Sequence, residues 1–427
     1  MSSVAPEEAA ISRGDAGDGA DLAARYRQVR EFTEQLAEPL SAEDQTVQSM
    51  PDVSPTKWHR AHTSWFFETF LLRPHLPGYR PYHPDYAFLF NSYYEAAGPR
   101  YTRARRGCVS RPGCEEIAGY RAHVDEHMEA LLGHCSGQPA VLDLTELGLH
   151  HEQQHQELLL MDIKHVLSQS PLDPAYVPAG QLAGSVGPRP TGTEWIPHEG
   201  GVAEVGHRGG GFAFDNEGPA HQVLLQPFAM AGRLVTCGEW LEFMADGGYR
   251  SASLWLSDGW AAVQSQGWEA PLYWDRDGDA WTVFTLGGRR PVDPGEPVCH
   301  VSYFEADAYA AWSGARLPTE FEWETLATGP VQGQLVDPRR VHPSPQPATS
   351  LFGQVWAWTS SAYLPYPGFR PAPGAVGEYN GKFMVSQQVL RGGSCATPAG
   401  HVRATYRNFF PPGARWPFTG VRLARDL

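Results

Sequence analysis

Two histidines spaced one helical turn apart are the clearest chemical signal in the sequence. They are the first and last residues of H-E-Q-Q-H (151–155), within a stretch whose apolar residues have helical spacing. Because each helical residue turns by about 100°, His151 and His155 lie within about 40° of each other and can bind one metal ion. Glu152 and Glu157 point about 100° or more away from His151, so neither is expected as a ligand. Gln154, about 60° away, can border the site.

A third metal ligand is expected from a second helical segment, 54–72. His62 lies on its apolar face, among the side chains of Trp58, Trp65, Phe66 and Thr69. His59, about 60° around the same helix, is the rival third ligand. Three imidazoles suit zinc or iron about equally by ligand type. On an octahedral metal they leave room for a substrate nitrogen, a thiolate and dioxygen.

Two other interpretations compete with this one. The run also matches the H-E-x-x-H motif of zinc metalloproteases, in which Glu152 would act as the general base. In a non-catalytic binding module, histidines on apolar faces would be ordinary core residues that need no metal. Metal content and oxygen uptake distinguish these three possibilities.

The segment 91–113 joins two helical segments and concentrates phenols and guanidinium groups. Tyr93 and Tyr94 are adjacent, and the densest positive cluster of the chain follows at Arg100, Arg103, Arg105 and Arg106. Arginine suits bidentate binding of a carboxylate. Solvated loop arginines are the alternative interpretation.

Four helical segments must position these side chains, at 20–40, 54–72, 114–134 and 144–167. Together they predict a four-helix bundle over 20–170, a fold that commonly builds its sites from inward-facing side chains. Residues 1–19 are rich in Gly, Ala, Ser and Asp and are expected to form a disordered leader.

The composition changes after the bundle. Residues 171–195 are rich in Pro, Gly and Ser and are expected to form a linker. Within 196–427, one clear amphipathic helix is predicted at 302–315, among short segments broken by turn signals. This region predicts an irregular α/β domain, and the whole chain a two-domain α+β fold.

Charge and composition exclude several classes of protein. The 427 residues include 33 Lys plus Arg and 48 Asp plus Glu, a net charge of −15, which argues against a nucleic-acid partner. No apolar run reaches 18 residues, so no membrane span is expected, and the first 20 residues do not resemble a secretory signal. Six cysteines without a C-x-x-C pattern predict a reduced, cytoplasmic protein.

With these residues in view, the sequence resembles the iron-dependent sulfoxide synthases of ergothioneine biosynthesis. That family joins a DinB-like four-helix bundle to a C-type-lectin-like domain similar to formylglycine-generating enzyme. In the bundle, the resemblance rests on K-W-H-R-A-H (57–62) and H-E-Q-Q-H (151–155). In the second domain it rests on V-S-Y-F-E-A-D-A-Y-A-A-W-S-G-A-R-L-P-T-E-F-E-W-E (301–324), G-Q-V-W-A-W-T (353–359), R-G-G-S (391–394) and G-V-R-L-A (420–424).

The resemblance implies an Fe(II) enzyme that uses O2 as co-substrate. Its iron ligands would be His62, His151 and His155, which favours His62 over His59. Family members bind hercynine, the trimethylated betaine of histidine, and form a C–S bond at imidazole C2 with oxidation to the sulfoxide.

The hercynine-binding residues implied by the resemblance come from both domains. Gln154 of the bundle and Asn408, in R-N-F-F, would contact the substrate. Phe409 or Phe410 could face its quaternary ammonium through a cation–π contact. Members that prefer γ-glutamylcysteine carry Trp-Asp where these two phenylalanines stand, and the missing Asp argues against that donor.

A second branch of the family, which uses free cysteine, resembles this chain in N-S-Y-Y-E-A. By that resemblance Tyr93 or Tyr94 would supply a proton or hydrogen atom during oxygen activation. Arg103 and Arg106, with Arg100 in the same cluster, would bind the carboxylate of the thiol donor.

Two related activities are alternatives. Selenoneine synthases share the two-domain layout and couple hercynine to a selenosugar, but a sugar has no carboxylate for the arginine cluster. Formylglycine-generating enzymes need two closely spaced cysteines shortly after R-G-G-S. Here Cys395 stands alone, so that oxidase chemistry is not expected.

Overall fold

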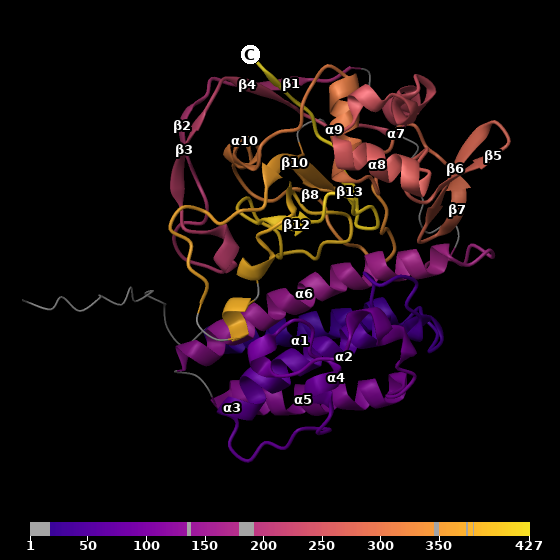
Figure 1. The fold of residues 1–427 in the computed structure, drawn as a ribbon. Coiled ribbons are helices and arrows are strands. Elements are labelled where there is room, and N and C mark those ends of the chain that lie inside the picture. The colour runs from indigo at the N-terminus through magenta and orange to yellow at the C-terminus, as the bar shows by residue number, and fades with distance from the viewer. Residues whose placement is uncertain (1–17, 135–137, 179–191, 346–349, 373–374, 379) are drawn as a thin grey trace, which may run out of the picture.

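The computed structural model describes residues 18–134, 138–178, 192–345, 350–372, 375–378 and 380–427. Helices fill the first part of the chain, and short strands with four further helices fill the second. Figure 1 shows the two parts as layers, with the helical part below the mixed part. This arrangement confirms the predicted α+β fold. Most of the predicted leader lies outside the described residues, and the first helix already begins at Asp18.

Four long helices make up the first part, at the predicted places. They are α1 (Asp18–Ala37), α2 (Thr56–Phe67), α5 (Cys114–His134) and α6 (Pro139–Ser168). Helix α2 continues through a π-helical turn, Glu68–Leu72, into α3 (Arg73–His75), and α4 (Tyr86–Leu89) is a single turn. Helix α6 packs against α1 and α2, and α2 also packs against α5.

Helix α2 is enclosed on all sides, and every one of its residues is buried. Its large side chains, Trp65, Phe66 and Phe67, fill the space between the neighbouring helices. Burying side chains of this size stabilises a fold by about 1.5–3 kcal/mol each. A histidine on this helix is therefore held in a rigid, nearly dry environment.

The second part contains small sheets, and none of them is large enough to form a continuous layer. A four-stranded sheet has the order β12-β11-β10-β13, with only β10 and β13 parallel, and a three-stranded antiparallel sheet has the order β1-β4-β14. The other strands form the ribbon β2-β3, the meander β5-β6-β7 and the pair β8-β9. The strands are β1 (Trp195–His198), β2 (Gly201–Val205), β3 (His221–Leu225), β4 (Phe228–Ala231), β5 (Trp274–Asp277), β6 (Ala280–Thr285), β7 (Gly288–Pro291), β8 (Gly333–Gln334), β9 (Phe352–Gly353), β10 (Trp356–Ala362), β11 (Gln388–Arg391), β12 (Asn408–Phe410), β13 (Thr419–Gly420) and β14 (Ala424–Asp426).

The second part is more helical than the sequence predicted. The helix expected at 302–315 is α9 (Tyr303–Trp312), and three others accompany it: α7 (Cys237–Ala245), α8 (Ser257–Gln266) and α10 (Glu320–Leu326). Helices α7, α9 and α10 each begin with a capping box, in which a Ser or Thr and a Glu three residues later satisfy each other's backbone N–H. The apolar pattern of α9 was long enough to predict that helix, whereas α7 and α10 are too short to show a period and their capping boxes are the sequence signal for them.

Helix α6 runs along the junction of the two parts (Figure 1). Its Glu157 is buried and accepts hydrogen bonds from the indole of Trp356 at 2.7 Å, the hydroxyl of Thr397 at 2.7 Å and the hydroxyl of Ser394. Burial raises the pKa of the Glu157 carboxyl above its ordinary value, and the three donors only partly offset this rise. Three second-part residues thus converge on one carboxylate of the bundle, and Lys164 of α6 makes a further contact with His300 of the second part.

Of the predicted linker, residues 179–191 lie outside the described residues, and its last residue, Trp195, already belongs to β1. Within the described residues, no helix combines the length and the apolar character needed to cross a bilayer.

Candidate metal centre and adjoining pocket

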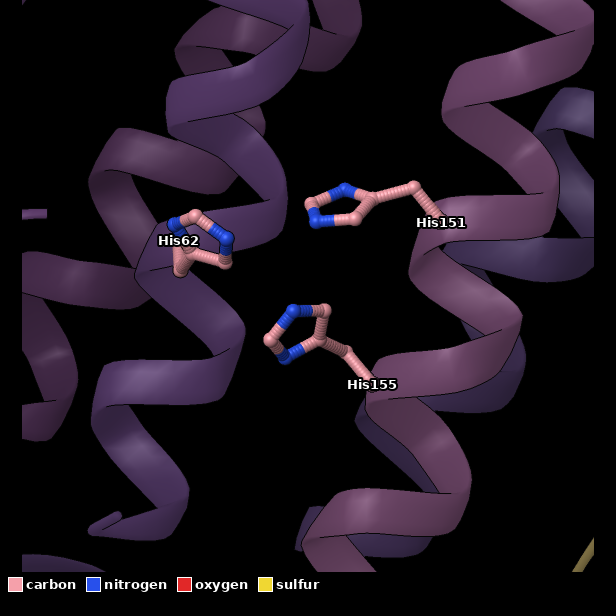
Figure 2. A group of neighbouring side chains, drawn as sticks. All are labelled: His62, His151 and His155. Atoms are coloured by element: carbon pink, nitrogen blue, oxygen red, sulfur yellow. The ribbon is translucent and has the colours of Figure 1, made fainter. Parts of the chain in front are cut away.

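Three histidines from two helices converge in the bundle. His62 comes from α2, and His151 and His155 come from α6; all three are buried. Figure 2 shows the rings of the α6 pair pointing toward the ring of His62. The ring centroids are 4.7–5.0 Å apart, and one nitrogen of each ring lies within 4.8 Å of the other two. This group can hold a metal ion, as the helical spacing predicted.

The ring of His62 is fixed by its surroundings. It lies between Trp58 and Trp65, nearly parallel to both, at centroid distances of 4.6 and 5.3 Å. Its Nδ1–H donates to the carbonyl of Phe90 at 2.6 Å, while its buried Nε2 has no hydrogen-bond partner among the described residues. Burial and the nearby His151 lower the pKa of His62. A neutral imidazole with a buried, unused Nε2 fits a metal ligand.

His59, the rival third ligand, does not belong to the group. Its Nδ1 lies 2.9 Å from Nδ1 of His155, on the side opposite the other rings, and its Nε2 lies 3.0 Å from Oδ2 of Asp162. His59 therefore contacts a candidate ligand from behind.

Glu152 points away from the histidines, as its helical angle predicted. Its carboxylate accepts hydrogen bonds from Arg30 at 2.8 Å, Arg121 at 3.0 Å and Thr33 at 2.6 Å. Burial alone would raise the pKa of Glu152, but Arg30 and Arg121 lower it to about 2. A carboxylate bound in this way cannot serve as the general base that the zinc-hydrolase interpretation requires.

A cavity of about 190 Å³ lies between α6 and the second part. On α6 it borders Gln154 and Leu158, which occupy the helix face next to the one that carries the histidines. Five residues singled out in the sequence line it: Tyr93, Gln154, Asn408, Phe409 and Phe410. Others were not expected, among them Asn216, Trp356, Asn380, Phe383 and Tyr406. The structure thus brings the two halves of the predicted substrate site together.

Tyr406 is the most informative of the residues that the sequence did not reveal. Its hydroxyl accepts a hydrogen bond from the Gln154 side chain at 2.7 Å and lies 3.1 Å from Nε2 of His401. The indole of Trp356 lies beside its ring, with centroids 5.5 Å apart. Tyr406 therefore fixes the carboxamide of Gln154 at the pocket wall. In the sequence, its position two residues before Asn408 was the available signal.

The phenylalanines of β12 are held by other aromatic rings. Phe409 stacks on Tyr363 at a centroid distance of 4.1 Å, and Phe410 meets Trp416 edge-on at 5.7 Å. The Asn408 side chain accepts a hydrogen bond from the backbone N–H of Phe409 at 2.9 Å. The pocket therefore has an aromatic wall of fixed orientation.

Tyr93 and Tyr94 stack on each other, with centroids 4.6 Å apart. Tyr94 is fully buried and contacts Trp65, which also packs on His62. Tyr93 lines the cavity, and burial raises its pKa. The two phenols therefore lie on different sides of the site, Tyr94 toward the histidines and Tyr93 toward the pocket.

The predicted arginine cluster separates into one buried residue, Arg106, and three exposed ones, Arg100, Arg103 and Arg105. The Arg106 guanidinium lies 3.4 Å from the ring centre of Trp58 and donates to the Ser54 hydroxyl at 2.9 Å. Its Nε has no hydrogen-bond partner, and no described carboxylate forms an ion pair with it. Arg103 and Arg100 are exposed; the former bonds to a backbone carbonyl and the latter pairs with an acidic side chain.

Comparison with known proteins finds a family model for the second part and relatives that span both parts. Residues 183–348 and 335–427 match the family model described as the sulfatase-modifying factor enzyme 1-like domain. Hercynine oxygenase of Mycolicibacterium thermoresistibile is 33% identical over 420 residues, which cover 88% of each chain. Hercynine oxygenase of Mycolicibacterium smegmatis is 34% identical over 422 residues, 88% of this chain and 92% of that one. Ergothioneine biosynthesis protein 1 of Schizosaccharomyces pombe is 27% identical over 232 residues, 50% of this chain and 28% of that one.

Proposed function

Since the chain belongs to the ergothioneine sulfoxide synthase family, we propose that it is an Fe(II)- and O2-dependent enzyme acting on hercynine. It joins a thiol to imidazole C2 and yields the hercynyl sulfoxide. The C2–H and S–H bonds break, the C–S bond forms, one oxygen atom enters the sulfoxide and the other leaves in water. The convergence of His62, His151 and His155 carries this proposal, together with a pocket bordered by Gln154, which lies between His151 and His155 on α6.

His62, His151 and His155 would hold the iron. The fit is supported by an all-nitrogen donor set, by burial, and by the unused Nε2 of His62. When bound there, the ion supplies redox chemistry toward dioxygen and a common anchor for the reactants. The two helices contribute rigidity, since their packed rings leave the ligands little freedom to reorient.

Hercynine is proposed to occupy the cavity. Gln154, held by Tyr406, and Asn408 offer amide groups on opposite walls for the polar atoms of the substrate. Phe409 and Phe410 offer ring faces and edges to its trimethylammonium group, a contact worth about 0.5–2 kcal/mol. A trimethylated cation cannot donate N–H hydrogen bonds, so an aromatic wall suits it better than a carboxylate.

The thiol donor is proposed to be an amino acid bound through its carboxylate. Arg106 is the best placed of the three arginines because it is buried, lies against Trp58 and forms no ion pair with a carboxylate in the part of the chain that the structure describes. Arg103 and Arg100, exposed on the same segment, would add to the positive charge near Arg106. The position after Phe409 is Phe410 and not an acid, which favours cysteine over γ-glutamylcysteine.

Tyr93 or Tyr94 is proposed to deliver a proton or hydrogen atom during oxygen activation. Both are held by stacking, and burial keeps the phenol of Tyr93 protonated by raising its pKa. A protonated phenol is the form that can donate.

Aerobic turnover with different donors tests the function. The protein would be loaded with Fe(II), mixed with hercynine and cysteine, γ-glutamylcysteine or a selenosugar in separate reactions, and analysed by mass spectrometry. We expect hercynyl cysteine sulfoxide, with oxygen uptake that requires both substrates and the metal. Coupling only to the selenosugar would assign the selenoneine synthase activity. Hydrolysis without oxygen, or no coupling with any donor, would contradict the proposal.

A further inference from the structure

A buried carboxylate and a buried histidine form a hydrogen-bonded chain behind one of the candidate ligands. Asp162 lies on α6, two turns beyond His155, and His59 of α2 lies between them. His59 Nδ1 is 2.9 Å from His155 Nδ1, and His59 Nε2 is 3.0 Å from Asp162 Oδ2. Exposed fractions of 2%, 3% and 9% for His59, Asp162 and His155 show that the whole chain of groups is buried.

The directions of these bonds follow from the chemistry of the groups. Asp162 Oδ2 also accepts the backbone N–H of Ser54 at 2.8 Å, which marks it as an acceptor. Its other neighbour, His59 Nε2, must then carry the proton of that bond. In the form of His59 that carries a single N–H, Nδ1 accepts, and the proton of the next bond lies on Nδ1 of His155. The lone pair of His155 is thereby placed on Nε2.

The same tautomer is set by different means at His62, where the Phe90 carbonyl accepts the Nδ1–H. In His62 and His155, Nδ1–H thus donates to a neighbouring acceptor, and Nε2 is left with its lone pair available for a metal ion. A backbone carbonyl cannot change its role, whereas a histidine can donate or accept. His59 therefore needs a second group to fix its direction, and Asp162 supplies it.

We propose that His59 and Asp162 are positioning residues that hold His155 as the Nδ1–H tautomer and direct its Nε2 to the metal. This inference rests on the metal site of the proposed function, but not on hercynine or the thiol. Groups that bond to a ligating histidine from behind typically change metal affinity by about 10–100-fold when removed. The inference also explains why a polar ring occupies the position of His59 in the enclosed helix α2.

Zinc affinity, measured by competition with a chromogenic chelator, tests the proposal without any turnover. His59→Leu removes the acceptor for His155, and His59→Gln restores an acceptor oxygen. His165→Leu is the matched control, because His165 is another buried histidine of α6 that bonds to Ser49 outside this chain of groups. We expect about 10–100-fold weaker binding for His59→Leu, with His59→Gln and His165→Leu close to the wild type.

Unchanged affinity in His59→Leu would overturn the proposal, and so would equal losses in all three variants. If His59→Leu does not fold, the 15N shifts of histidine-labelled, zinc-loaded wild type decide. A protonated Nδ1 on His155 supports the proposal, and a protonated Nε2 contradicts it. A wild type that binds no zinc at all would remove the metal site itself, and the proposed function with it.

Discussion

The two parts of the molecule contribute to the site in opposite ways. The bundle presents His62, His151 and His155 from the middle of long helices, where each ring is enclosed by packed neighbours. The second part presents Asn408, Phe409 and Phe410 from a three-residue edge strand. Metal ligands tolerate little displacement, whereas substrate contacts can be rearranged.

This difference indicates a division of labour between chemistry and selectivity. Buried ion pairs support the edge strand from beneath: Arg391 and Arg407 both bind Glu320, at 2.9 and 2.8 Å. Arg407 directly precedes Asn408 in the chain, so these buried ion pairs lie next to the residues that line the pocket. We expect that substitutions in the bundle abolish activity, whereas substitutions in the second part only change substrate preference.

Removing a ligand should have the largest effect. His151→Ala deletes one of the three proposed metal ligands, so we expect loss of bound iron and no detectable sulfoxide, measured by metal analysis and mass spectrometry. His165→Ala, on the same helix, should keep both metal and product. Normal iron content in His151→Ala would contradict the proposal that the bundle supplies the metal ligands.

The tyrosine pair should change the product and leave the metal in place. Tyr93→Phe, Tyr94→Phe and the double variant keep the stacked rings but remove the phenolic protons, so turnover should be diverted toward thiol dioxygenation. Mass spectrometry of the oxidised thiol would measure this, with Tyr101→Phe of the same loop as the control. Normal sulfoxide yield in the double variant would refute the role.

Glu152 should matter for stability, and its effect should depend on pH. Its folded pKa of about 2 lies below the ordinary value, so its stabilising contribution is present above about pH 5 and is lost as the pH falls toward 2. We expect Glu152→Gln to lower the free energy of unfolding by about 3 kcal/mol at pH 7 and by less at pH 3.

Denaturant unfolding at both pH values measures this difference, and Glu129→Gln, an exposed glutamate of the same bundle, is the control. A difference that stayed constant with pH would show that the ion pairs with Arg30 and Arg121 are not its source.

Arg106 should control affinity for the thiol donor. Replacing Arg106 by Leu removes a charged hydrogen-bond donor, so we expect KM for cysteine to rise by about 10–100-fold with a smaller change for hercynine. Steady-state kinetics on both substrates would show the split, with exposed Arg105→Leu as the control. An equal rise for both substrates would instead indicate general damage to the site.

The aromatic wall should give the smallest effect. Phe409→Leu keeps the apolar volume but removes the ring face, so KM for hercynine should rise by about 2–30-fold without loss of iron. Phe88→Leu, an exposed ring on α4, serves as the control. Loss of iron in Phe409→Leu would show that the two parts are not separable in function.

The bundle and its histidines could be predicted because long helices repeat their apolar positions often enough to reveal which residues face inward. The pairing of His59 with Asp162 could not be predicted, since it depends on the relative axial position of the packed helices α2 and α6. Tyr93 and Tyr94 could not be told apart because their loop has no period.

In the second part, the signature motifs predicted the fold but not the lining of the pocket. Tyr406 and Trp356 reach Gln154 and Glu157 from segments without periodic character, and only the folded chain places them there. The capping box at Thr236–Glu239, by contrast, was a readable signal for a helix that the apolar pattern did not show.

The hydrogen bonds that Trp356, Ser394 and Thr397 donate to the carboxylate of Glu157 have a consequence for how this fold can evolve. We expect that strands and loops of the second part can change without displacing α6 as long as those three donors, and neighbouring contacts such as that of His300 with Lys164, remain in register with it. The histidine group of the bundle would then be inherited unchanged, while residues around the pocket diversify.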